Sequence, residues 1–168
     1  PRKVDLGQIN GRYFTFTAGF GLDASVVRSV DRRPDRKHRY GARYFAWSAV
    51  RTFLRHYLWR PPQVDVEIDG RTVRGINVLV QNGDPLTYFQ YTPLHVAEEI
   101  ALDSGDLAGA VLHRATLIDV PTVALRLFSR RLRVVDHRHV TGFSHVETIR
   151  ARSADGRPVA LQCDGDWL

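Results

Sequence analysis

The stretch that decides the fold is Val64-Asp-Val-Glu-Ile-Asp-Gly-Arg-Thr-Val-Arg-Gly-Ile-Asn-Val-Leu-Val80. Apolar and polar residues alternate on both sides of Asp69-Gly70, which is the pattern of two half-buried strands. An Asp-Gly pair suits a type I′ turn, because both central residues of that turn need a positive φ. The stretch therefore predicts an antiparallel β-hairpin.

The same pattern recurs toward the end of the chain. Residues 146–163 alternate around Asp155-Gly156 and predict a second hairpin, with Pro158 at an edge or non-bonding position. Further strands are expected over residues 13–18 and 107–113. Strands outnumber helices and short turns separate them, so we expect a mainly β, β-sandwich-like fold with two or three helices.

Three segments have helical character. A short helix is expected over residues 23–30 and a third over 121–129, starting at Pro121. The longest is expected over 40–58, where Tyr44, Trp47, Leu54 and Leu58 recur at three- and four-residue spacing. Two prolines at 61 and 62 end it, because proline cannot continue a helix.

Composition limits the class of protein. The net charge is +6 and the pI is about 10.0, which favours nucleic acid, phosphorylated ligands or an anionic membrane surface as partners. The sequence contains no run of 18 apolar residues, so no membrane-spanning helix is predicted. No signal peptide is visible. Cys163 is the only cysteine, so an internal disulfide is excluded. Its alternation with Val159 and Leu161 favours a packing role.

Basic residues concentrate before and within the long helix. They are Arg28, Arg32, Arg33, Arg36, Lys37, Arg39, Arg43, Arg51 and Arg55. A basic amphipathic helix can lie on an anionic membrane surface. The alternative is a solvated face on a helix that packs its apolar stripe on the sheet, and the two interpretations are compatible.

Four stretches carry a family resemblance in order along the chain. They are Asn10-Gly-Arg-Tyr-Phe14 with Ala18-Gly-Phe-Gly-Leu-Asp-Ala24, then Arg39-Tyr-Gly-Ala-Arg-Tyr44, then Thr92-Pro93 with Leu102-Asp-Ser-Gly-Asp-Leu107, and last Leu161-Gln-Cys-Asp-Gly-Asp166. Together they resemble the C-terminal domain of the bacterial diacylglycerol kinase and sphingosine kinase family of lipid kinases. The last stretch is similar to the Asp-Gly-Glu/Asp motif on that family's final strand.

The resemblance implies one domain over residues 1–168. In the family, this domain follows an ATP-binding domain with a Gly-Gly-Asp-Gly-Thr loop, and no such loop occurs in this sequence. We therefore expect the N-terminal ATP-binding domain of the same polypeptide to lie upstream of Pro1. Implied cofactors are Mg²⁺ and ATP, the latter held mainly by that domain, and the implied location is the cytoplasmic inner face of the membrane.

The resemblance also assigns roles to two carboxylates. Asp164 would be the general base that accepts the proton of the lipid hydroxyl, and Asp166 would help hold Mg²⁺. In a locally extended segment, residues i and i+2 point the same way, so the two acids would face one site. Asp166 stands where many family members have Glu. The alternative is that Asp164-Gly165 is a third Asp-Gly turn with no chemical role.

Three residues near the first motif are expected at the substrate. Asp23 corresponds to an acid that contacts the lipid head group in the sphingosine kinase branch, and Gly19 and Gly21 permit a tight turn or close packing. Asp23 can equally be an idle acid at a helix N-terminus. Asp103 matches a structural Mg²⁺ loop, although Ser104 in place of a second acid argues against a metal there. The pair His137 and His139 lacks a further ligand at a metal-binding spacing.

These expectations define the function hypotheses. The first is a lipid kinase domain that phosphorylates diacylglycerol or a similar lipid alcohol to phosphatidic acid or its equivalent. The second is a non-catalytic lipid- or membrane-binding module, which would have no need of the acid pair. The third, a non-specific nucleic-acid binder, rests on pI alone, and we expect no nucleic-acid partner because the aromatics lie mainly in apparent core positions. Self-association as a homodimer is also open.

Overall fold

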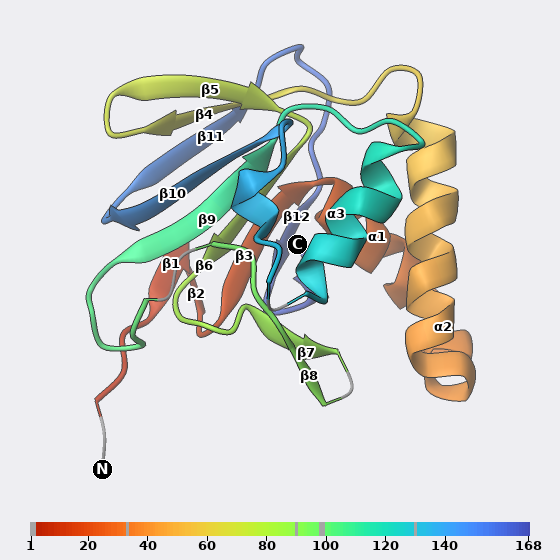
Figure 1. Cartoon of the computed structure of the whole chain (residues 1–168), viewed down its shortest axis with the longest axis horizontal. Helices are drawn as coiled ribbons and strands as arrows, with labels where there is room; N and C mark the ends of the chain where they lie inside the picture. Colours follow the sequence, from red (N-terminus) through yellow and green to blue (C-terminus); the bar gives the residue numbers. More distant parts are fainter. Residues whose placement is uncertain (1–2, 33, 90, 98–99, 130) are drawn as a thin grey trace.

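A computed structural model describes residues 3–32, 34–89, 91–97, 100–129 and 131–168. Its largest feature is a fully antiparallel six-stranded sheet (Figure 1). In spatial order the strands are β10 (Val140–Val146), β9 (Leu107–Leu112), β6 (Asn77–Gln81), β3 (Thr17–Gly21), β12 (Leu161–Cys163) and β13 (Asp166–Trp167).

A second sheet packs on one face of the first. It contains β11 (Ile149–Ser153), β4 (Val64–Ile68) and β5 (Arg71–Gly75). Val66 of β4 and Val78 and Val111 of the larger sheet are fully buried in one apolar cluster between the layers. Cys163 belongs to the same cluster, which confirms its packing role. The predicted β-sandwich-like class is confirmed.

Two small hairpins and four helical segments complete the described chain. The hairpins pair β1 (Gly7–Ile9) with β2 (Arg12–Phe14) and β7 (Thr87–Phe89) with β8 (Thr92–Leu94). The helical segments are α1 (Leu22–Asp31), α2 (Pro34–Thr52) with a π-helical turn η1 (Phe53–Tyr57), α3 (Asp119–Leu127) and a 3₁₀ turn η2 (Val134–Asp136). None of the helices in the described ranges is long and apolar enough to cross a membrane.

The helices cover the face of the larger sheet that the small sheet leaves open (Figure 1). Val26 and Val30 of α1 pack with Tyr44 of α2, and Val123 of α3 packs against a cluster that contains Ala110 of β9. The long helix starts earlier than predicted, and Gly41 interrupts it with a φ of 48° and a ψ of −127°. Both faces of the larger sheet are therefore covered.

The predicted hairpin around Asp69-Gly70 is confirmed, with φ values of 48° and 75° at the two turn residues. After β5, however, the chain crosses into the larger sheet as β6. The crossing occurs at Gly75, the last residue of β5. Glycine is needed there because a Cβ would lie 2.5 Å from Cγ1 of Val111. The deciding stretch thus contributes strands to both layers.

The predicted hairpin around Asp155-Gly156 is wrong. Strand β11 pairs with β4, whereas β12 pairs with β3 in the other sheet. The connecting loop is instead tied to the segment after η1, because Arg157 donates hydrogen bonds to the carbonyls of Arg60 and Pro61 (2.9 and 2.8 Å) and also binds Asp155. Pro158 has no N–H to donate to a hairpin ladder at this point.

Candidate functional site

The Asp164-Gly165 pair forms the turn between β12 and β13. Both residues have a positive φ, 47° and 85°, and Cys163 pairs with Asp166 across the turn. The expectation of a locally extended segment is therefore wrong, since two consecutive left-handed residues reverse the chain. The two acids belong to a tight turn at the edge of the sheet and not to one extended strand.

The Asp164 carboxylate holds a loop of the same sheet. Its Oδ2 accepts a hydrogen bond from the backbone N–H of Thr15 (2.7 Å), and its Oδ1 accepts from those of Phe16 and Thr17 (2.8 and 2.9 Å). These contacts divide the predicted strand 13–18 into β2 and β3. A carboxylate has about four acceptor positions, so one position on Oδ2 receives no hydrogen bond from the described part of the chain.

Asp166 is exposed on β13, and none of the described residues donates a hydrogen bond to its carboxylate. Its neighbour Trp167 is anchored to α1, with the Arg28 guanidinium 4.7 Å from the ring centre. The described residues contain no group of three His, Cys, Asp or Glu side chains arranged for a metal. A Mg²⁺ ion commonly takes one or two carboxylates together with substrate phosphates, and Asp166 fits such a shared site.

Asp23 lies at the start of α1 with its carboxylate over Gly19. A Cβ at Gly19 would lie 1.9 Å from Oδ2 of Asp23, so glycine is needed to make room for the acid. Gln162 donates a hydrogen bond to Oδ2 (3.1 Å), while Oδ1 is buried without a partner among the described residues. Burial raises the pKa of Asp23 to about 6, although the Gln162 hydrogen bond opposes the shift.

Gln162 connects this acid to the Asp164-Gly165 turn. Its Oε1 accepts a hydrogen bond from the N–H of Gly165 (2.9 Å), while its Nε2 reaches Asp23. The sequence analysis missed Gln162, because alternation in β12 placed it on the face opposite Cys163. That face is covered by α1, and Gln162 is only 4% exposed. A polar residue between two core residues was the available signal.

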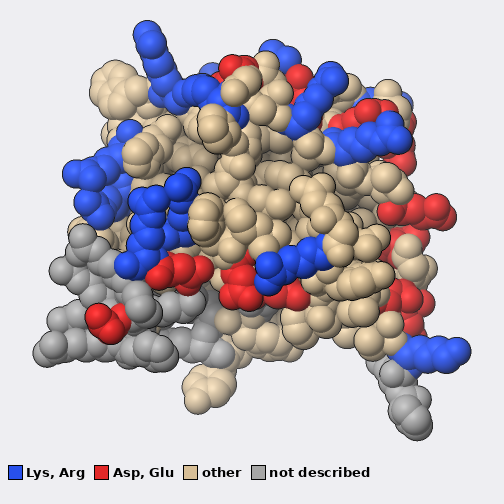
Figure 2. Space-filling view, turned by 180° about the vertical axis from the view of Figure 1, so that it is seen from behind, with Lys and Arg blue, Asp and Glu red and all other residues tan. Residues whose placement is uncertain are grey.

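The other candidate residues lie apart from this site. Asp103 is exposed in a loop in which Asp5 accepts a hydrogen bond from the N–H of Gly105 (2.7 Å). Arg32 is exposed after α1, and Arg33 lies outside the described residues, as do the side chains of Arg36, Lys37 and Arg39. On the back of the molecule, lysine and arginine side chains gather along the top and toward the side of α2, whereas several acidic ones line the opposite edge (Figure 2).

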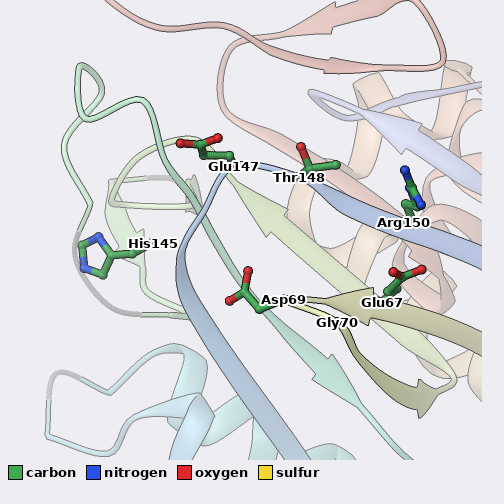
Figure 3. A pocket seen from close by; sticks show the side chains of 7 residues that line it. All are labelled: Glu67, Asp69, Gly70, His145, Glu147, Thr148 and Arg150. Carbon is green, nitrogen blue, oxygen red and sulfur yellow. The ribbon is translucent and has the colours of Figure 1, made fainter.

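A pocket of about 500 Å³ lies at the corner where β10 continues into β11 (Figure 3). Strands β10 and β13 form opposite edges of the larger sheet, so this pocket is separate from the Asp164 turn. Its lining residues are Glu67, Asp69, Gly70, His145, Glu147, Thr148 and Arg150. The sequence analysis did not find it, and its acidic lining suits no anionic ligand.

His137 and His139 surround a buried acid at the start of α3. His139 Nδ1 and Arg138 both lie 3.2 Å from the carboxylate of Asp119, which is 1% exposed. Burial alone would raise the pKa of Asp119, but hydrogen bonds from Thr116 and Arg138 and the nearby His139 hold it at about 2. Burial lowers the pKa of His137. The cluster ties α3 to the end of the sheet.

We expect Asp119→Asn to lower the free energy of unfolding by about 2 kcal/mol at pH 7, because a carboxylate with a depressed pKa stabilises the fold above its unfolded-state value near 4. This contribution is lost as pH falls through about 2, so the difference from wild type shrinks below pH 4. Urea unfolding across this range measures it, with exposed Asp136→Asn as the control. An equal deficit at pH 7 and pH 3 would contradict the linkage.

We expect Asp23→Asn to act in the opposite direction. The raised pKa of Asp23 means that its contribution is fully present below pH 4 and lost as pH rises through about 6. Relative to wild type, the variant gains about 2 kcal/mol between pH 4 and pH 7.5, since it removes a charge that is costly to bury. Thermal and urea unfolding at both pH values test this. A difference between the variant and wild type that does not change with pH would show that burial does not raise the pKa of Asp23.

The domain is an antiparallel β-sandwich with helices on the open face of its larger sheet and an acidic turn at one edge of that sheet. It is similar to a solved diacylglycerol kinase from Bacillus anthracis str. Sterne, with a TM-score of 0.61 and 18% sequence identity over 98% of this chain and 49% of that one. Two further structures from the same strain, each provisionally described as a diacylglycerol kinase, give TM-scores of 0.58 and 0.59 at 18% and 17% identity.

These similarities establish the fold. All three cover 98% of this chain, which spans about half the length of each solved structure (49%, 49% and 50%). No protein-family model matches the sequence, and no curated protein matches it. The resemblance drawn from the four sequence stretches is thus confirmed at the level of fold.

Proposed function

We propose that this chain is the C-terminal, substrate-side domain of an ATP- and Mg²⁺-dependent lipid kinase. It would phosphorylate the hydroxyl of diacylglycerol or a similar lipid alcohol to give phosphatidic acid or its equivalent. The observation that carries the proposal is the hydrogen-bonded connection from Asp23 through Gln162 to the turn that bears Asp164 and Asp166.

Each residue has a separate task in this mechanism. Asp23 accepts a hydrogen bond from a hydroxyl of the lipid head group and orients it. Oδ2 of Asp164 would take the proton from the lipid hydroxyl as that oxygen bonds to the γ-phosphorus of ATP and ADP leaves. Asp166 would help hold Mg²⁺, and that ion would supply neutralisation of the phosphate charge of ATP, which the N-terminal domain of the same polypeptide would mainly bind. Thr15, Phe16 and Thr17 fix the Asp164 carboxylate in place.

The substrate would be drawn from the cytoplasmic face of an anionic membrane, to which the domain binds peripherally. The basic segment formed by Arg32, Arg33, Arg36, Lys37 and Arg39 supplies charge for this contact. Unchanged binding to anionic vesicles after neutralisation of these residues would remove this part of the proposal.

The test is transfer of labelled phosphate from ATP to diacylglycerol in mixed micelles, using the full-length polypeptide with and without Mg²⁺. A phosphorylated lipid that appears only with both ATP and Mg²⁺ supports the proposal. If no product forms from diacylglycerol, sphingoid bases or glycolipid alcohols, the kinase assignment is wrong.

A non-catalytic lipid-binding module is the second candidate, and one observation favours it. Asp164 has a structural task, since its carboxylate organises three backbone amides and would be retained without any chemistry. The presence of the acid pair therefore does not by itself distinguish a kinase from a binding module. Lipid binding without ATP-dependent product would select the module.

A further inference from the structure

Helix α3 packs one apolar face inward, and exposed apolar residues lie on its opposite side, at Leu125 of the helix and at Ile118, which immediately precedes it. The inner stripe contains Val120, Val123 and Leu127, which pack against the two core clusters beside the larger sheet. Ile118 and Leu125, seven residues apart and thus on one side of the helix, point outward and are 70% and 63% exposed. A helix that only covers a sheet needs one apolar face, so the outer stripe requires a separate explanation.

The outer stripe continues into the segments that flank the helix. Its members are Leu117, Ile118, Leu125, Phe128 and Leu132, with exposures of 60%, 70%, 63%, 46% and 43%. We call this set the α3 surface. Hydrogen bonds tie α3 to the segment that follows it, because Arg126 donates to the carbonyl of Arg133 (3.0 Å) and Thr122 contacts His137 (3.1 Å).

The segment that carries the α3 surface is rich in positive charge. From Arg114 to Arg138 the chain contains six arginines, of which Arg130 lies outside the described residues, and only two acids. Asp119 is buried beneath Arg138, so Asp136 is the exposed acid of this segment. Arg114, Arg131 and Arg138 lie at the surface. Exposed aliphatic side chains in a segment rich in exposed arginines are complementary to lipid tails beneath anionic head groups.

We propose that the α3 surface is a docking site for an anionic lipid bilayer, into whose interface the outer stripe inserts. Four of its five apolar members are aliphatic, which suits acyl chains and offers few stacking platforms for nucleic-acid bases. The surface also lies on the helix-covered face of the larger sheet, as does α2 (Figure 1). Because Val120 packs in one cluster with Phe53 and Tyr57 of η1, α3 adjoins the end of the long helix.

Vesicle binding by the full chain, measured by co-sedimentation without nucleotide, tests this proposal independently of phosphoryl transfer. Vesicles contain phosphatidylcholine alone or mixed with phosphatidylglycerol. We expect Ile118→Gln with Leu125→Gln to weaken binding to the mixed vesicles about tenfold, and Arg131→Gln about fivefold. Matched controls are Leu6→Gln, at a leucine that is 54% exposed, and Arg71→Gln, at an exposed arginine of the β4–β5 hairpin. Both should stay within twofold of wild type.

Three results would overturn the proposal. In the first, the α3 variants bind as wild type while neutralising Arg32, Arg36 and Lys37 abolishes binding, which leaves the membrane contact of the proposed function at α2 alone. In the second, the controls lose as much affinity as the α3 variants. In the third, a Leu125→Cys thiol is protected from labelling in the full chain without lipid, which assigns the surface to another part of the protein or, if the protection is lost on dilution, to a second copy.

Discussion

Gly21→Ala is expected to lower the free energy of unfolding by about 4 kcal/mol. Gly21 has a φ of 96° and a ψ of −123°, a region that L side chains rarely adopt. A Cβ at this position would lie 2.2 Å from the carbonyl oxygen of Ile76, which is backbone and cannot turn aside. The N–H of Gly21 also donates to the carbonyl of Ala160 (3.0 Å), so any shift of Gly21 would disturb the pairing of β3 with β12.

Gly11→Ala is the matched control for this prediction. Gly11 also has a positive φ, 83°, but nothing lies within 4 Å of a Cβ built there. Gly11→Ala should therefore lower the free energy of unfolding by only about 1 kcal/mol, which is the cost of the left-handed backbone conformation alone. Urea unfolding of both variants separates the two terms. If Gly21→Ala were no worse than Gly11→Ala, the close approach to Ile76 would not constrain the fold.

The sequence predicted local structure better than the pairing of strands. Asp69-Gly70 and Asp155-Gly156 look alike as turns, but only the first joins two strands of one sheet. The difference lies in Arg157, whose contacts with carbonyls about a hundred positions earlier cannot be read from local alternation. The crossing of the chain between the two layers at Gly75 could not be predicted either, because apolar and polar residues alternate regularly before and after Gly75.

The residues of the candidate site could be singled out from sequence, but the contacts that connect them could not. Asp23, Asp164 and Asp166 were singled out by their motifs, and the structure joins the first to the turn of the other two through Gln162. The three amides that bind Asp164 come from residues almost 150 positions earlier. Such contacts depend on β3 and β12 being neighbours, which is a property of the complete sheet.

Asp164→Asn is expected to have two effects. Asparagine places an NH₂ group where one carboxylate oxygen now accepts from the amides of Thr15 to Thr17, so one donor faces another donor. We expect a loss of about 1–3 kcal/mol of stability. If the proposed function is correct, ATP-dependent phosphorylation of diacylglycerol should also fall by at least about a hundredfold, because the general base is lost.

Asp69→Asn provides the control that separates these effects. Asp69 holds the corresponding place in the β4–β5 turn, with a φ of 48°, and its carboxylate accepts no hydrogen bond from the described residues. It should change neither stability nor activity. Assays run at a temperature where both variants are folded, with vesicle binding as a check, distinguish the outcomes. Lost activity in folded, lipid-binding Asp164→Asn places this carboxylate in the chemistry, whereas retained activity at reduced stability would leave it a purely structural acid and require another group to accept the proton.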